Sequence, residues 1–303
     1  MTRILVTGAT GFIGREARPL LLAGGHEVIA VSTSVPIDLP AGVECLQANL
    51  TDPASVTDMV QKAGASHLLH LAWHRAAGGL WNAPENMDWL QATLQLGRAF
   101  LDAGGTRIVL CGSCGEYDWT GGTCREDETP LTPSTYYGAC KLAAETALAH
   151  LCRINDKSFA CGRPFFIYGP GEAPARLGAS VILSLLKGEE ALCSHGKQLR
   201  DYMHVRDVAG GLVALLTSQH EGNFNIASGE AIQVKDLINA MAAEIGRPEL
   251  VKLGARDAPA HEPELIVADM TKTRDALNWQ PQYDLVSGVA DTVEWFRKNA
   301  DLA

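Results

Sequence analysis

The sequence has no long run of apolar residues. None of its stretches reaches the roughly 18 uncharged apolar residues that a membrane-spanning helix needs. The apolar run near the N-terminus, residues 4–6, is far shorter than the core of a signal peptide. With 303 residues, 47% of them hydrophobic, the chain can still bury a large core in about two lobes. These features predict a soluble, cytoplasmic protein.

Basic residues are scarce relative to acidic ones. The chain has 25 Lys and Arg against 35 Asp and Glu, which gives a formal charge of −10. A negatively charged protein repels phosphate backbones and anionic lipid surfaces. We therefore expect no nucleic-acid partner and no membrane partner.

The eight cysteines lack the pattern of a metal site. They are scattered through apolar surroundings, where free thiols behave as small hydrophobic groups. Cys111 and Cys114 have the spacing of a redox or zinc motif, but no second cysteine pair completes four ligands. His70 and His74 are four residues apart, yet Leu71 stands where a zinc protease needs glutamate. We expect reduced thiols and no metal.

Short β-branched runs alternate with longer amphipathic ones in the first half of the chain. The sequence predicts strands at residues 3–7, 26–31, 43–47, 67–72, 107–112 and 159–164. It predicts helices between them at 12–23, 53–62, 86–103 and 134–152, and less regularly later at 177–187, 207–217, 234–245 and 285–298. Alternating strands and helices indicate an α/β fold with a parallel, doubly wound sheet.

Glycines recur every three residues directly after the first expected strand. Gly8, Gly11 and Gly14 lie between that strand and an amphipathic helix. Without side chains, the backbone turns tightly and a pyrophosphate can approach the amides at the helix N-terminus, where the helix dipole favours negative charge. The motif predicts a Rossmann-like dinucleotide site. The other residues of this turn expected at the cofactor are Thr10, Phe12 and Ile13.

A tyrosine, a lysine and a serine form a candidate catalytic set. Tyr137 and Lys141 share one face of the expected helix, and a nearby ammonium lowers the pKa of a phenol toward the working range. Alone, this pair is common on helix surfaces. Ser113 follows the fifth expected strand, at the edge where open α/β sheets bind ligands. Its hydroxyl can hydrogen-bond a substrate oxygen beside the tyrosine.

These motifs, together with four others, resemble those of the extended short-chain dehydrogenase/reductases, specifically the nucleotide-sugar epimerase/dehydratase/reductase group. The others are RPFFIYGP at 163–170, RDYMHVRDV at 200–208, FNIASG at 224–229 and LNWQP at 277–281. The resemblance covers nearly the whole chain, and the motifs stand in the family's order. It implies an NAD(P)-dependent oxidoreductase that acts on a nucleotide sugar.

The resemblance also implies an organisation into two interleaved lobes. Residues 1–165 with about 205–228 correspond to the dinucleotide-binding Rossmann domain. Residues 166–204 and 229–303 correspond to a small lobe that binds the nucleotide sugar. Helices 86–103 and 134–152 correspond to those that pair in a homodimer as a four-helix bundle.

By resemblance, each motif residue acquires a role. Tyr137 would be the general acid/base, Lys141 would hold the nicotinamide ribose and lower the pKa of Tyr137, and Ser113 would bind the reacting oxygen. Arg200 matches the arginine that contacts the substrate's diphosphate. The further cofactor contacts implied are Asn49 and Leu50, in place of an Asp-Leu pair near the adenine, and Leu71 and Ala72.

Departures from the family pattern narrow the reaction. Dehydratases of this group carry Asp-Glu directly after the serine or threonine, whereas this chain has Cys114 and Gly115, with Glu116 one residue late. A dehydratase is therefore not expected. Cys114 remains a candidate substrate contact beside Ser113.

The substrate pocket also departs from the pattern. Trp89 takes the place of the asparagine that usually opens the helix after the fourth strand, and the arginine expected before Ala268 is displaced, with Arg256 upstream. Tryptophans near the carboxyl edge of the sheet, Trp73 among them, could stack on a sugar or base or belong to the core. The candidate substrate contacts are therefore Ser113, Cys114, Arg200, Trp73 and Arg256.

The end of the second strand bears on the cofactor's phosphate. A carboxylate there repels a 2′-phosphate and favours NAD, but this chain has Ser32, Thr33 and Ser34. Arg15 could add positive charge, or could be a solvated helix residue. We therefore favour NADP(H), with NAD(H) as the alternative.

Three functions remain open. The first is a reductase that passes hydride to the 4-keto group of a nucleotide-linked 4-keto-6-deoxysugar. The second is a nucleotide-sugar 4-epimerase that retains NAD. The third is a sensor that binds the dinucleotide without catalysis, against which the complete set of Ser113, Tyr137 and Lys141 argues.

Overall fold

The computed structural model describes residues 1–34, 39–74, 79–258 and 262–299. Its largest element is a seven-stranded sheet in the order β11-β7-β5-β4-β1-β2-β3, with every neighbouring pair parallel. The strands are β1 (Arg3–Thr7), β2 (Glu27–Ser32), β3 (Val43–Gln47), β4 (His67–His70), β5 (Arg107–Cys111), β7 (Ser158–Pro164) and β11 (Gly222–Ile226). The doubly wound fold expected from the sequence is confirmed, and strand order reverses between β1 and β4.

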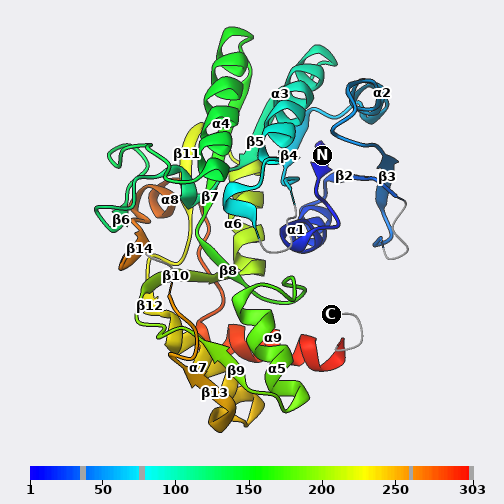
Figure 1. Ribbon diagram of the computed structural model, residues 1–303. Helices are drawn as coiled ribbons and strands as arrows, with labels where there is room; N and C mark the ends of the chain where they lie inside the picture. Colours follow the sequence, from blue (N-terminus) through cyan, green and yellow to red (C-terminus); the bar gives the residue numbers. More distant parts are fainter. Residues whose placement is uncertain (35–38, 75–78, 259–261, 300–303) are drawn as a thin grey trace.

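Helices cover both faces of this sheet (Figure 1). One face carries α2 (Pro53–Ala63), α3 (Asn86–Asp102) and α4 (Tyr136–Ile154), and the other carries α1 (Phe12–Ala23) and α6 (Val205–Thr217). Because side chains alternate along a strand, Leu5 packs with the first group of helices, whereas Ile4 and Val6 pack with the second. Burial on both faces explains why these strands are almost continuously apolar.

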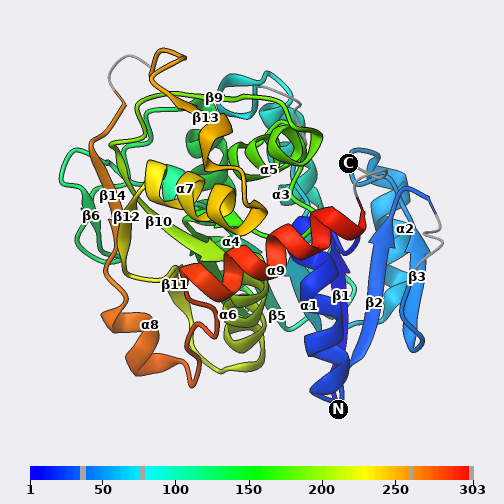
Figure 2. The same ribbon diagram turned by 90° about the horizontal axis from the view of Figure 1, so that it is seen from below.

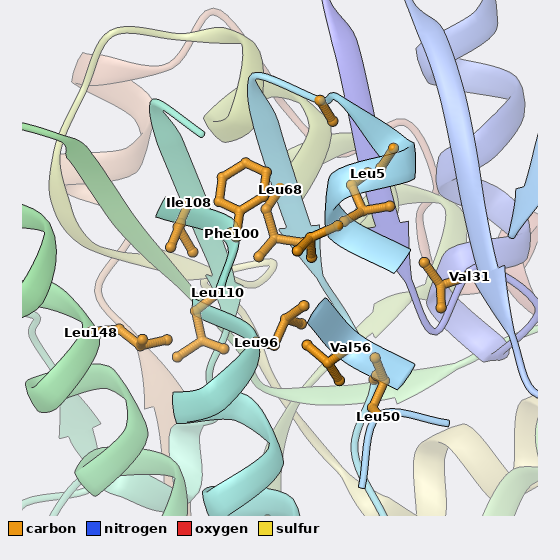
Figure 3. Packing of buried hydrophobic residues seen from close by; sticks show 14 of the residues in the cluster. Leu5, Val31, Leu50, Val56, Leu68, Leu96, Phe100, Ile108, Leu110 and Leu148 are labelled. Carbon is orange, nitrogen blue, oxygen red and sulfur yellow. The ribbon is translucent and has the colours of Figure 1, made fainter. Parts of the chain in front are cut away.

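The core on the α2–α4 side brings together residues that are far apart in the sequence. Figure 3 shows Leu68, Ile108 and Leu110 of the sheet facing Leu96 and Phe100 of α3, with Leu148 of α4 beside them. Full burial of such a side chain stabilises the fold by about 1.5–3 kcal/mol. The sheet is thereby fixed against α3 and α4, two helices that also reach the candidate active site.

A second group of elements lies beyond the carboxyl ends of the strands (Figures 1 and 2). Its sheet has the order β12-β10-β14-β6, and β8 also pairs with β10. These strands are β6 (Thr123–Cys124), β8 (Phe166–Tyr168), β10 (Leu199–His204), β12 (Ala231–Gln233) and β14 (Leu265–Ala268). Since β6 comes from the first half of the chain, this lobe is interleaved with the large sheet.

Helices complete this lobe. Its helices α5 (Leu177–Lys187), α7 (Val234–Ile245) and α9 (Leu285–Lys298) share one apolar cluster, and α8 (Thr271–Ala276) packs near β11. The remaining elements are the pair β9 (Ala191–Cys193) and β13 (Val251–Leu253) and the short 3₁₀ helices η1 (Leu80–Asn82), η2 (Cys114–Glu116) and η3 (Pro248–Leu250). Across the described ranges, no helix combines the length and apolar character needed to cross a membrane.

Two helix starts differ from the expected ones because of capping. The Thr135 side chain accepts a hydrogen bond from the Gly138 amide at 3.1 Å, so α4 begins at Tyr136 rather than at residue 134. The His204 side chain accepts one from the Arg206 amide at 3.4 Å, so α6 begins at Val205 rather than at residue 207.

Candidate active site

The turn between β1 and α1 has the geometry of a phosphate-binding turn. Gly8 has φ +66°, and a β-carbon there would lie 2.8 Å from the Ala72 amide nitrogen. A β-carbon on Gly14 would lie 2.2 Å from the Gly8 carbonyl oxygen, so only glycine fits where α1 packs on the turn. Within the described residues, no side chain forms a capping hydrogen bond at Gly11, the N-cap of α1. The first backbone amides of α1 are therefore available to bind an anion. These features fit a dinucleotide pyrophosphate.

The turn after β4 forms the neighbouring wall. The Leu71 amide donates to the Thr7 carbonyl at 3.2 Å, and the Ala72 amide donates to the Thr7 hydroxyl at 3.4 Å. His70 bridges Thr7 at 2.6 Å and Thr93 of α3 at 2.9 Å. Burial and the nearby Lys141 charge lower the pKa of His70 to about 3, so this imidazole is neutral at physiological pH. The expected cofactor residues Leu71 and Ala72 therefore lie against the glycine turn.

The residues expected around the adenosine differ in exposure and in hydrogen-bond partners. Ser32 is half-buried, Thr33 and Ser34 are exposed, and the Gln47 amide donates to the Thr33 carbonyl at 2.8 Å. The Asn49 side chain accepts hydrogen bonds from the Thr51 amide and hydroxyl. Leu50 is buried in the core.

Arg15 lies beside the loop between β8 and α5. Gly171 belongs to this loop, and a β-carbon added to it would lie 2.3 Å from Arg15 Nη1. The extra positive charge considered for a 2′-phosphate is therefore directed to that loop.

Ser113, Tyr137 and Lys141 converge at the carboxyl end of β5. Ser113 and Lys141 are buried, and Tyr137 is partly buried. A β-carbon on Gly115 would lie 3.3 Å from Ser113 Oγ and 3.7 Å from the Tyr137 ring. Parallel strand ends and the first turns of α4 thus bring together residues 24 positions apart in the sequence.

The pKa of Tyr137 is raised in this structure, whereas the sequence led us to expect a lowered pKa. Burial raises the pKa of Tyr137, and the neighbouring Ser113 hydroxyl lowers it by less than burial raises it. Lys141 Nζ donates to the Cys111 carbonyl at 2.8 Å and lies 4.0 Å from the centre of the Trp73 ring. Because burial outweighs the effect of neighbouring groups, Tyr137 is protonated at neutral pH and can donate a proton.

Tryptophan rings surround Tyr137. The Trp73 ring lies edge-on to Tyr137 at 6.1 Å between centroids, and the Trp81 ring does so at 5.7 Å. Trp81 is 42% exposed and also contacts Trp119 at 6.1 Å. Trp73 is therefore in the site as expected, whereas Trp81 was weighed only as one of several tryptophans near this edge.

An asparagine does open α3, one turn before the position assigned to Trp89. Asn86 is buried and accepts a hydrogen bond from Trp73 Nε1 at 2.8 Å, and its amide donates to the carbonyls of Leu80 and Ala83. Trp89 instead packs against the core. Asn86 thereby fixes the tryptophan that lies between the lysine and the tyrosine.

The residues expected to contact the substrate differ in burial and in the elements that carry them. Cys114 is buried beside Ser113, and burial raises the pKa of its thiol, so it stays protonated. Arg200 on β10 is 2% exposed and donates to Glu262 Oε1 at 2.8 Å. Arg256 is exposed, and its amide donates to the Cys193 carbonyl of β9 at 3.1 Å.

Sequence reasoning missed a buried group of charges beneath Ser113. Arg163 of β7 contacts Glu116 and Glu145. The spacing Ser-x-x-Glu from Ser113 to Glu116 is that of a capping box, and Glu145 follows Lys141 by four residues. These two spacings are the sequence patterns from which the buried charges could have been predicted.

The chain is similar to known proteins over nearly its whole length. It is 29% identical to the UDP-glucose 4-epimerase of Mycolicibacterium smegmatis, over 98% of this chain and 99% of the relative. It is 27% identical to the dTDP-6-deoxy-L-talose 4-dehydrogenase (NAD(P)(+)) of Kitasatospora kifunensis, over 95% and 94%. The structure of MoeE5 in complex with UDP-glucuronic acid and NAD superimposes with a TM-score of 0.85, at 29% identity, covering 98% and 99%.

A match to a family model shows which family the chain belongs to. The model of the NAD dependent epimerase/dehydratase family matches residues 4–227, which span β1 to β11 and include the glycine turn and the Ser113, Tyr137 and Lys141 set. The expected resemblance to extended short-chain dehydrogenase/reductases is therefore confirmed. The protein is an enzyme that belongs to the NAD dependent epimerase/dehydratase family.

Proposed function

We propose that the protein reduces the 4-keto group of a nucleotide-linked 4-keto-6-deoxysugar with NADPH. The observation that carries this proposal is that Ser113 and Tyr137 both lie beside Gly115, where a β-carbon would be 3.3 Å from Ser113 Oγ and 3.7 Å from the Tyr137 ring, with Lys141 one turn along α4. The bound nicotinamide supplies the hydride. Every proton and hydrogen bond needed at the reacting oxygen comes from these side chains.

Each of the three residues has a distinct task. Ser113 Oγ accepts a hydrogen bond from the Gly115 amide at 3.1 Å, which leaves its own proton free to donate to the sugar's carbonyl oxygen. Tyr137, protonated at neutral pH, gives its proton to that oxygen as negative charge develops there. The ammonium of Lys141 stabilises the phenolate that remains. Trp73 and Trp81 offer aromatic faces for the C–H groups of the sugar.

The residues after Ser113 argue against water elimination. Cys114 is a protonated, buried thiol and Gly115 has no side chain, so neither supplies the acid and base that a dehydratase needs. The Kitasatospora relative acts, by its name, on a 4-position of a dTDP-6-deoxysugar. We propose that Arg200, held by Glu262, contacts the substrate's diphosphate, because a guanidinium binds phosphate with charge-assisted hydrogen bonds.

We propose NADP(H) as the cofactor. Ser32, Thr33 and Ser34 offer hydroxyls and no carboxylate at the end of β2, so a 2′-phosphate meets no repulsion from them. We also propose a cytoplasmic homodimer formed through α3 and α4, with residues 1–165 and about 205–228 as the cofactor domain. The sugar nucleotide would then be bound by 166–204 and 229–303.

The test combines cofactor analysis with a substrate panel. The purified protein would be denatured and any released dinucleotide identified, then 4-keto-6-deoxy sugar nucleotides with different bases would be offered with NADPH or NADH. Stoichiometric consumption of NADPH supports the proposal. Tightly held NAD with interconversion of 4-epimers, and no net consumption, would replace it with an epimerase. Cofactor binding without turnover on any sugar nucleotide would indicate a dinucleotide sensor.

A further inference from the structure

Ser113 is held by a capping box of the short helix η2. Its backbone amide donates to Glu116 Oε1 at 2.8 Å, and its Oγ accepts from the Gly115 amide at 3.1 Å. Both the main chain and the side chain of the serine are therefore fixed by residues of its own loop. Glu116 provides one of these two contacts.

Glu116 is in turn joined to the helix that carries Tyr137. Its Oε2 accepts from Arg163 Nε at 2.6 Å, and Arg163 Nη2 donates to both carboxylate oxygens of Glu145 at 2.8 and 2.9 Å. Tyr137, Lys141 and Glu145 recur every four residues on α4 and so share one face. A continuous chain of charge-assisted hydrogen bonds thus connects the amide of Ser113 to α4.

The loop and the helix also approach too closely for most side chains. A β-carbon on Gly138 would lie 2.0 Å from the Gly115 carbonyl oxygen, and one on Gly112 would lie 2.8 Å from Glu116 Oε1. Backbone packing therefore leaves little room for adjustment. Small shifts of Glu116 are transmitted to Ser113 rather than absorbed.

We infer that Glu116 is a positioning residue that, through Arg163 and Glu145, sets the placement of Ser113 relative to Tyr137. The inference rests on the proposed function, in which these two hydroxyls act on the reacting oxygen. Glu116 itself is fully buried beneath the loop and does not contact the substrate.

A merely structural role explains this cluster less well. Glu145 alone gives Arg163 a two-oxygen partner, so a second buried carboxylate is not needed to neutralise it. Burial raises the pKa of Glu116, which means that keeping its charge in this place is costly. Burial lowers the pKa of Lys141, and the charge of Glu116 opposes that lowering. The carboxylate is therefore placed where it acts on the catalytic set.

A metal site does not explain it either. Ligand atoms of Glu116, Glu145 and Cys161 lie within 4.8 Å of one another. However, the Arg163 guanidinium already occupies both carboxylates, and a cation among them would face its positive charge.

The test uses Glu116→Gln, with Tyr117→Phe as the matched control. Glutamine keeps the size but has one acceptor and one donor group, so it loses the contact with either the Ser113 amide or Arg163. Tyr117→Phe removes the buried hydrogen bond to Asn225 at 2.8 Å and keeps the aromatic ring, whose centre lies 4.7 Å from Arg163 Cζ, so the ring contact with Arg163 is the same in the control. Both variants would be combined with Ser113→Ala.

We expect Glu116→Gln to lower kcat about 10-fold in the wild-type background, with KM for the cofactor within about twofold, and to change kcat less than about twofold when Ser113 is alanine. Tyr117→Phe should have the same small effect on kcat in both backgrounds. Equal losses from Glu116→Gln in both backgrounds, or no loss, would overturn the inference while the proposed function stands.

A crystal structure of Glu116→Gln decides the question without turnover. We expect the Ser113 side chain to move relative to Tyr137 in this variant and to keep its place in Tyr117→Phe. If no panel substrate is turned over, the proposed function fails, and this comparison still tests the positioning role. An unchanged distance between the hydroxyl oxygens of Ser113 and Tyr137 in Glu116→Gln would refute it.

Discussion

Replacing Arg163 with methionine should destabilise the protein strongly. The arginine side chain is fully buried, as is that of Glu116, and Glu145 is 6% exposed, so the substitution leaves two carboxylates in the interior without their cation. Removing one partner of a buried ion pair costs about 3–5 kcal/mol. At roughly 2 °C per kcal/mol for a chain of this size, Tm should fall by roughly 6–10 °C. Methionine keeps the apolar stem, so lost packing contributes little.

The matched control is Arg206→Met. Arg206 also makes two ion pairs, with Glu16 and Asp291, but its side chain is 41% exposed, and we expect a loss under about 1 kcal/mol. Such exposed pairs are weakened by solvent.

The effect of Arg163→Met should also depend on pH. Without the guanidinium the pKa of Glu116 rises further, so the folded state binds a proton more tightly than the unfolded state does. That contribution to stability is present at low pH and lost as pH rises, so the deficit should be larger at about pH 8 than at about pH 5. Urea denaturation at both pH values measures it. Equal costs for the two arginines, or a deficit that grows on acidification, would refute the reasoning.

Four further outcomes are expected. Tyr137→Phe should lower turnover by about 10²–10⁴ and leave the cofactor Kd nearly unchanged in a fluorescence titration; full activity would remove Tyr137 from the mechanism. Ser32→Asp should weaken NADPH far more than NADH, because a carboxylate repels the 2′-phosphate; equal changes in the two Kd values would contradict this. Arg200→Ala should raise KM for the sugar nucleotide and spare KM for the cofactor, and unaltered kinetics would argue against the diphosphate contact. Burial raises the pKa of Glu172 to about 7, so its contribution to stability is lost as pH rises from about 4 to about 7. Glu172→Gln should therefore raise the free energy of unfolding at about pH 8, by about 3 kcal/mol at most, and raise Tm with it; both gains should be much smaller at about pH 5. A pH-independent difference in Tm would count against that explanation.

The sequence predicted six of the seven strands of the large sheet, because each of these six carries its own pattern, and it did not predict the edge strand β11. Apolar, β-branched runs specify β1 to β5 and β7, and the bounds of α1 and β1 agree with those expected. The second sheet was not predicted. Its strands β6, β8 and β12 have two or three residues, too few to show a period, and β6 pairs with β14 far along the chain.

The same distinction holds for the candidate site. Ser113 and Tyr137 could be placed together because parallel strands end at one edge of a sheet. The direction of Lys141 could not, since it depends on the Cys111 carbonyl and the Trp73 ring. Glu116 was interpreted as a displaced member of a catalytic pair, although its distance from Ser113 is that of a capping box.

Long-range ion pairs have no local pattern at all. Arg200 pairs with Glu262, 62 residues away, and nothing near either residue in the sequence predicts the partner. Such contacts form only when segments that are distant in the sequence pack together.

The edge strand β11 determines the order in which the fold can be completed during synthesis. It pairs with β7 through five residues, yet α5, β9, β10 and α6 are made between the two strands. Until Gly222–Ile226 leave the ribosome, the outer edge of β7 remains an open row of hydrogen-bonding groups, a state prone to association with other chains. A fragment that ends after Pro164 contains every catalytic residue proposed here but lacks the strand that closes this edge. Expression of the nucleotide-binding half alone therefore requires β11 to be supplied, through a permuted chain or a linked peptide.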